Sequence, residues 1–152
     1  MRDVATLKGL LDRVKGANGS SFAIETEIAL VLDRAPDGFK YIESVHVWEQ
    51  GNPVSMSFDT WMPPPYTASL GAAMALASSV LPGKHWHICA GCASATEPLY
   101  GAAFFDHGDD GVTLDEPLAI AEHEHGAALA VIAAILHALI ASASVHQKGL
   151  GS

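Results

Sequence analysis

Apolar residues recur at helical spacing in several parts of the chain. The spacing predicts helices over residues 3–16, from residue 20 or 21 to about residue 34, from residue 67 or 69 to residue 81, and over residues 126–146. Thr67 or Ser69 can cap the third helix, and Pro82 with Gly83 ends it. Its apolar stripe consists of Leu70, Ala73, Met74, Ala77 and Leu81.

Residues 85–89 alternate as in a strand, and residues 99–105 are expected to form a second strand that follows it. Two shorter strands are expected on either side of residues 50–53. Pro53 would have to lie at the start or on the edge of its strand, because proline has no N–H to donate.

The connecting segments are rich in proline, glycine and acidic residues. The prolines at 63–65 predict an extended connector that leads into the third helix. Residues 106–111 are expected to form a solvated turn, because they lack the ligand spacing of a calcium loop. Thr113 and Glu116 have the spacing of a capping box, at which a helix could begin.

These elements predict a single α+β domain over residues 1–152. We expect a small, mostly antiparallel sheet of about three to five short strands, flanked by helices as in an α/β sandwich. Residues 1–19 would form an N-terminal helix, residues 20–146 the sandwich, and residues 147–152 a tail. The third and last helices would cover the sheet.

Composition fits an ordered domain, since 49% of the residues are hydrophobic and only 16% are charged. The net charge is −9, and the basic residues are spread along the chain. An acidic surface repels phosphate backbones, so nucleic acid is not an expected partner. Residues 2–15 lack the apolar centre of a secretory signal, and a single pair of cysteines makes no disulfide framework. The cytoplasm is therefore the expected location.

The last predicted helix resembles a membrane span in length, because residues 127–145 are apolar apart from His137, Ser142 and Ser144. A span needs about 20 mostly apolar residues. This run is rich in alanine, has a histidine near its centre and lacks basic or aromatic anchors at its ends. We expect a buried core helix and no membrane contact. Its all-round apolar surface also favours self-association through this helix.

Side chains suited to metal chemistry gather in the first of the two longer predicted strands. His85, His87 and Cys89 alternate, so a strand places them on one face. Cys92 completes a C-x-x-C with Cys89, and all four residues are of the kind that binds zinc. His85 and Cys89 would lie about 13 Å apart along the strand, which is too far for both to bind one ion. Adjacent pairs could bind together, with further ligands from elsewhere.

His123 and His125 are the candidates for those further ligands. On a regular helix their rings would point about 200° apart, whereas a loop or an extended turn could bring them together. Glu122 would share a helical face with His125. The H-E-x-x-H signature of zinc proteases is absent from the sequence, because no second histidine stands at the required position.

Structural roles compete with the zinc hypothesis. Buried cysteines are often inert, and half-exposed histidines on strands need no ligand. Dithiol redox chemistry would need a helix that begins at the C-x-x-C, but a turn is expected after Cys92. The sequence contains no P-loop, no G-x-G-x-x-G and no G-x-S-x-G. It therefore favours a protein that is not an enzyme.

Residues 66–76, Tyr-Thr-Ala-Ser-Leu-Gly-Ala-Ala-Met-Ala-Leu, are followed by Leu-Pro-Gly and then by a tryptophan in the next strand. This segment resembles the phage ABA-sandwich domain family, small proteins of phages and prophages with a "YTxSLDAAxxLV" helix and an alanine- and leucine-rich last helix. Residues 24–29 look like the acidic helix opening of that family, and residues 126–136 look like its last helix. Gly71 stands where the family has aspartate, and residues 108–125 look longer than its connection.

The resemblance spans residues 20–140 and is most specific over residues 64–105. It implies an α/β sandwich and no established reaction, so it supplies neither catalytic residues nor metal ligands. We therefore expect a non-enzymatic accessory protein of phage or prophage type that binds a partner or a small ligand. The alternative is a metal-binding protein or metal-dependent hydrolase that uses His85, His87, Cys89 and the 122–125 cluster.

Overall fold

The computed structural model describes residues 3–34, 48–49, 52–53, 63–94, 97–106 and 118–150. Within these ranges, the side chains of residues 48–53, 91–98 and 145–150 are outside the description. Most of the loop at 106–111 and the capping box at 113–116 also lie outside the described residues. The described part contains four helices, a three-stranded sheet and a separate two-stranded ladder.

The four predicted helices are all present. They are α1 (Val4–Lys15), α2 (Phe22–Val31), α3 (Leu70–Val80) and α4 (Ala127–Leu150). Ser21 caps α2 and Ser69 caps α3: the Ser69 hydroxyl accepts a hydrogen bond from the Ala72 N–H at 3.1 Å. Gly83 follows the end of α3 with a φ of +76°, a conformation that glycine adopts without strain. The predicted stop at Pro82 and Gly83 is therefore confirmed.

The main sheet contains β3 (His85–Ser94), β4 (Glu97–Phe105) and β5 (Ala119–His123), antiparallel and in that spatial order. A short ladder pairs β1 (Trp48–Glu49) with β2 (Asn52–Pro53), where a hairpin was expected. Strand β3 is longer than predicted, so Cys92 lies inside the strand and the turn expected directly after it is wrong.

Strand β5 was not predicted, because its segment was expected to form a turn or the start of a helix. Alanine is a poor strand former, and the run Ala119–His123 therefore carries a weak strand signal. Backbone pairing with β4 decides the conformation, and the small Ala121 side chain points toward α4. Gly126, with a φ of +151°, then turns the chain from β5 into α4.

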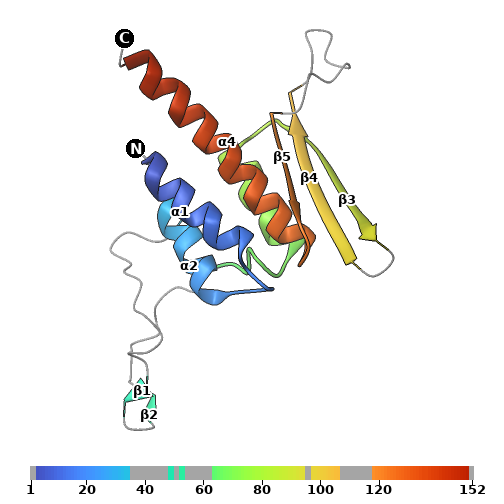
Figure 1. The fold of residues 1–152 in the computed structure, drawn as a ribbon. Coiled ribbons are helices and arrows are strands. Elements are labelled where there is room, and N and C mark those ends of the chain that lie inside the picture. Colours follow the sequence, from blue (N-terminus) through green and yellow to red (C-terminus); the bar gives the residue numbers. More distant parts are fainter. Residues whose placement is uncertain are drawn as a thin grey trace.

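The helices pack as a layer on one face of the sheet, as Figure 1 shows. Helix α4 crosses this face, contacts β4 and β5, and packs against α1 and α3 on its other sides. The outer face of β5 carries Ile120, whose side chain is 59% exposed, and no described helix covers that side of the sheet. The expected α+β sandwich is confirmed.

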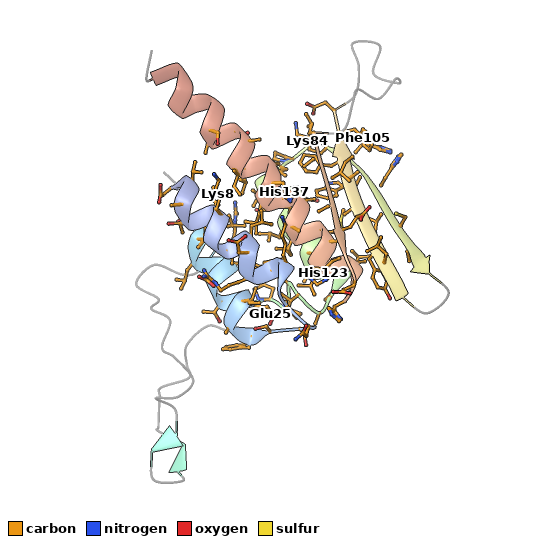
Figure 2. All side chains as sticks on the ribbon, viewed as in Figure 1. Lys8, Glu25, Lys84, Phe105, His123 and His137 are labelled. Carbon is orange, nitrogen blue, oxygen red and sulfur yellow. The ribbon has the colours of Figure 1, made fainter. Side chains whose placement is uncertain are left out.

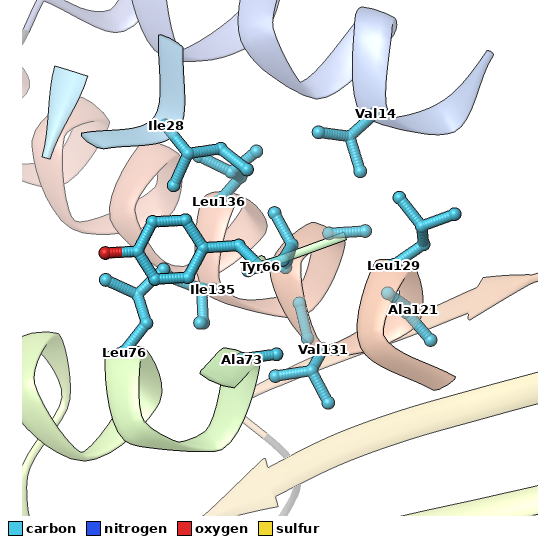
Figure 3. Close-up of a cluster of buried hydrophobic side chains, with 14 of the residues drawn as sticks. Val14, Ile28, Tyr66, Ala73, Leu76, Ala121, Leu129, Val131, Ile135 and Leu136 are labelled. Atoms are coloured by element: carbon cyan, nitrogen blue, oxygen red, sulfur yellow. The ribbon is translucent and has the colours of Figure 1, made fainter. Parts of the chain in front are cut away.

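The core lies where α4 meets the other helices and the sheet. An unbroken run of α4 residues from 128 to 136 is buried, and Figure 3 shows the Tyr66 ring among Ile28, Leu76 and Ile135. Burial raises the pKa of Tyr66, and the nearby Arg34 guanidinium offsets part of that rise. Each fully buried leucine or isoleucine side chain contributes about 1.5–3 kcal/mol to folding.

Helix α4 is long and apolar enough to cross a membrane by length and composition alone. Residues Ala127–Ser144 have a mean hydropathy of 2.2, and half of that window is buried inside the protein. The α1 and α3 helices and the sheet surround its first half, which explains why the helix is apolar on several sides. The helix continues past His146 to Leu150, into the predicted tail.

Candidate functional site

The predicted metal ligands are divided between the two faces of the β3–β4–β5 sheet. His85, His87 and Cys89 are on the outer face, as their alternation predicts. Their cross-strand partners on β4 are Phe105, Ala103 and Gly101. Trp86 and Phe104 are on the inner face, where their ring centroids are 4.8 Å apart. Among the described residues nothing covers the outer face, whereas the inner face is filled by the core.

The His85 and His87 rings converge on the outer face. Their Nε2 atoms are 3.1 Å apart, and the ring centroids are separated by 4.9 Å at an interplanar angle of 71°. At this distance one imidazole donates a hydrogen bond and the other accepts it. The Phe105 ring lies 5.0 Å from the His87 ring and supports it from β4. We call these two histidines the outer pair.

Cys89 is an exposed, free thiol two residues beyond His87. Its Sγ lies over Gly101, where an added Cβ would come within 3.0 Å of the sulfur. The absence of a side chain at Gly101 therefore leaves room for the Cys89 thiol. Cys89 and Cys92 are three strand residues apart, or about 10 Å, which exceeds the Cα separation that a disulfide can span.

His123 is on the opposite face, where its side chain is only 4% exposed. Its Nε2 is 2.8 Å from the Val14 carbonyl oxygen, and its Nδ1 accepts a hydrogen bond from the His125 N–H at 3.0 Å. This arrangement assigns the proton to Nε2, which donates to a carbonyl at the end of α1. Both ring nitrogens are engaged, so His123 attaches the β5–α4 turn to α1 and offers a metal no lone pair.

The sheet therefore lies between His123 and the outer pair. Figure 2 labels His123 and also Phe105, the cross-strand partner of His85. His125 is on the surface beside Glu124, with 3.9 Å between the imidazole and the carboxylate. Among the described side chains, no group of three or more histidine, cysteine, aspartate or glutamate residues is arranged to hold a metal ion. The four residues His85, His87, His123 and His125 do not form one site.

A buried polar network that the sequence did not predict joins α2 to the turn before α3. Glu25 is 7% exposed, and its Oε2 accepts hydrogen bonds from the Thr67 hydroxyl at 2.7 Å and the Thr67 N–H at 3.1 Å. The Thr67 hydroxyl also accepts from the Ser21 N–H at 2.8 Å. Thr67 thus serves the α2 N-terminus instead of capping α3.

Glu25 and Thr67 belong to the two segments on which the family resemblance was based, the acidic helix opening and the segment that begins with Tyr-Thr. These motifs were the sequence feature that could have pointed to the network. Helical spacing alone could not show that the two segments meet in the fold. The Glu25 carboxylate lies in the first turn of α2, where the helix dipole favours a negative charge. Every polar group in the network is hydrogen-bonded, which indicates a structural role.

A cleft of about 500 Å³ lies where the end of α3, the sheet and the second half of α4 meet. We call it the end cleft. Lys84 and Asp106 form an ion pair at its rim, with 2.5 Å between Nζ and Oδ1. Figure 2 shows Lys84 at the same end of the sheet as Phe105. The cleft is lined by Leu81, Lys84, Phe104, Asp106, Leu118, Ala138, Ala141 and Ser142.

Comparison with known proteins adds no relative. No family model matches the chain, no curated protein is significantly similar to it, and no solved structure matches it. The resemblance to the phage ABA-sandwich domain family stays a prediction that rests on its own motifs.

Proposed function

We propose that the protein is a non-enzymatic binding module and that the end cleft holds its ligand. The cleft carries this proposal, because it combines an apolar interior with one ion pair at the rim. Its volume of about 500 Å³ lies in the range of about 300–1,000 Å³ typical of small-molecule sites. The occupant that fits is a small amphipathic molecule with an anionic group.

The chemistry of the lining supports this choice of ligand. Phe104 and Leu118 offer apolar surface from the sheet, and Ala138 and Ala141 leave space because their side chains are small. An anionic group can take the place of Asp106 beside the Lys84 ammonium, since Asp106 is about half exposed and free to turn toward water. Without such a ligand, Lys84 pairs with Asp106.

The phage or prophage origin in this proposal rests on the resemblance over residues 64–105 alone. An accessory role follows from that resemblance, which implies an architecture without an established reaction. A catalytic role would need an activated nucleophile or a general base beside the ligand. The charged groups of the end cleft instead neutralise each other, and this favours binding.

The test uses 8-anilinonaphthalene-1-sulfonate, a fluorescent probe with apolar rings and one sulfonate. We expect saturable binding of one probe per chain. Ala141→Phe should weaken this binding at least about tenfold, or 1.4 kcal/mol, because the new ring fills the cleft from an exposed position on α4. Ala5→Phe places the same ring on an exposed position of α1, away from the cleft, and should change nothing.

Lys84→Met provides a second arm, because it keeps the apolar stem and removes the charge that would attract the sulfonate. We expect weaker probe binding that no longer depends on salt concentration. If Ala141→Phe and Lys84→Met both bind the probe as the unmodified protein does, the end cleft is not the ligand site.

Self-association through α4 stays part of the proposal in a narrower form. The first half of the helix is buried within the chain, so only the second half can meet another copy. Leu139 and Ile140 are partly exposed there. Sedimentation at several protein concentrations tests this point, and a monomer at every concentration would contradict it.

A further inference from the structure

We infer that the outer pair, His85 and His87, is a binding site for one divalent transition-metal ion, with zinc and copper as the fitting metals. This inference is independent of the end cleft. It rests on the geometry of two imidazoles on the open face of the sheet, and it narrows a broad set of candidate ligands to two.

The distance between the two rings suits chelation. With metal–nitrogen bonds of about 2.05 Å, the 3.1 Å between the two Nε2 atoms corresponds to a nitrogen–metal–nitrogen angle of about 98°. Square-planar copper sites have angles of about 90°, and tetrahedral zinc sites have angles of about 109°. The outer pair lies between these values. On binding, the ring that donates the hydrogen bond exchanges its Nε2 proton through water for one on Nδ1, and the rings rotate so that both Nε2 lone pairs point at the ion.

The fold holds the pair in this arrangement before a metal arrives. Both histidines are on β3, where the strand pleat directs alternate side chains to the same face. Phe105 packs against the His87 ring and is also the cross-strand partner of His85. Little ordering of side chains is then required on binding, which favours affinity.

The surroundings leave the remaining coordination positions to water or to a further ligand. The His87 side chain is exposed, and the outer face of the sheet is uncovered among the described residues. Two ligands from the described residues plus water describe an open site that exchanges its metal, in contrast to the closed, four-ligand sites of structural zinc. Imidazole nitrogen suits zinc and copper better than magnesium or calcium, which prefer oxygen.

Cys89 and His123 are not ligands in this site. The Cys89 sulfur lies over Gly101 of the neighbouring strand, and among the described residues it forms no group of three metal-binding side chains with the two histidines. His123 uses both ring nitrogens in hydrogen bonds on the opposite face of the sheet. The described part of the chain thus provides two imidazoles, and the metal is expected to bind to the folded chain without altering the core.

Calorimetric titration of the whole chain with zinc chloride tests the inference. We expect one ion per chain at the outer pair. His85→Gln and His87→Gln should each lower the affinity at least about tenfold, because each leaves a single imidazole. His125→Gln removes an exposed histidine outside the pair, and Cys89→Ser removes the neighbouring thiol; both should bind zinc as the unmodified protein does.

A gain-of-binding variant keeps the test decisive if either glutamine variant fails to fold. Ala103 is opposite His87 on β4 and on the same face, with a Cβ–Cβ distance of about 4.5–5.5 Å expected for such pairs. Ala103→His should therefore supply a third imidazole and raise zinc affinity at least about tenfold. Electron paramagnetic resonance with one equivalent of Cu²⁺ should show two coordinated nitrogens in the unmodified protein and three in the variant.

The inference is overturned if the unmodified protein binds no zinc at millimolar concentration. It is also overturned if both glutamine variants retain full affinity, or if Ala103→His gains none. In each of these cases, the outer pair would be a hydrogen-bonded pair of surface histidines and nothing more.

Discussion

One face of the β3–β4–β5 sheet packs against α4, and the other is open among the described residues. Both faces carry histidines, yet their surroundings differ. His123, on the covered face, has both ring nitrogens in hydrogen bonds to backbone groups. His85 and His87, on the open face, direct their Nε2 atoms toward each other.

This difference shows that burial decides the role of a histidine on this sheet. A buried imidazole must be hydrogen-bonded, because an unpaired polar group away from water costs about 1–3 kcal/mol. A surface imidazole has water as an alternative partner, so it can exchange that water for a metal or a ligand. The covered face should therefore respond to mutation in stability, and the open face in binding.

The largest contrast in stability should come from apolar residues on the two sides. Leu129→Ala removes a fully buried side chain from α4 and should lower the free energy of unfolding by about 2–5 kcal/mol. Ile120→Ala removes a side chain of similar size that is mostly exposed on β5, and should change it by less than about 0.5 kcal/mol. Urea denaturation of both variants measures the contrast. Equal losses would mean that the open face is covered after all.

Replacing histidines on the two faces should show the same contrast in the free energy of unfolding, with a smaller difference. His123→Leu leaves the Val14 carbonyl and the His125 N–H without their partner, and should cost about 1–3 kcal/mol. His87→Leu should change the free energy of unfolding by less than about 0.5 kcal/mol, because the ring is exposed. Chemical denaturation of both variants under the same conditions measures the difference. A neutral effect of His123→Leu would contradict its role as the link between α1 and the β5–α4 turn.

The buried network at Thr67 tests whether polar groups on the helix side are structural. Thr67→Val removes the hydroxyl that joins Glu25 to the Ser21 N–H, and should cost about 1 kcal/mol. The loss is at the lower end because the Thr67 N–H still donates to Glu25. Thr6→Val makes the same change at an exposed position of α1 and serves as the control in thermal unfolding. Equal melting temperatures for the two variants would refute a structural role.

Periodicity predicted the helices well because amphipathic spacing reports directly which face is buried. It failed at β5, where Ala119 and Ala121 face inward and carry almost no strand preference. That failure also misplaced His123, since only the pairing of β5 with β4 turns this ring toward α1. The network at Thr67 likewise depends on a contact between segments that are distant along the chain.

The outer pair shows the opposite case, in which local pattern was sufficient. An alternating strand fixes the side on which His85 and His87 lie, and the structure confirms their common face. Spacing could not reveal the 3.1 Å approach of the two rings, because that depends on Phe105 from the neighbouring strand. The alternation along a strand thus identifies side chains that share a face. Contacts with neighbouring strands decide which of these side chains approach each other.

The smallest expected effect concerns His137, which Figure 2 shows on α4 beside α1. Burial lowers the pKa of His137, and the positive charge of Lys15 lowers it further. The unfolded chain therefore binds a proton at a higher pH than the folded chain does. The contribution of His137 to stability is complete above its ordinary pKa of about 6.5, and it is lost as the pH falls through the lower folded value. His137→Gln should consequently flatten the fall in urea midpoint between about pH 7 and pH 5 relative to the unmodified protein. A slope equal to that of the unmodified protein would show that the position between α1 and α4 does not disfavour the charged imidazole.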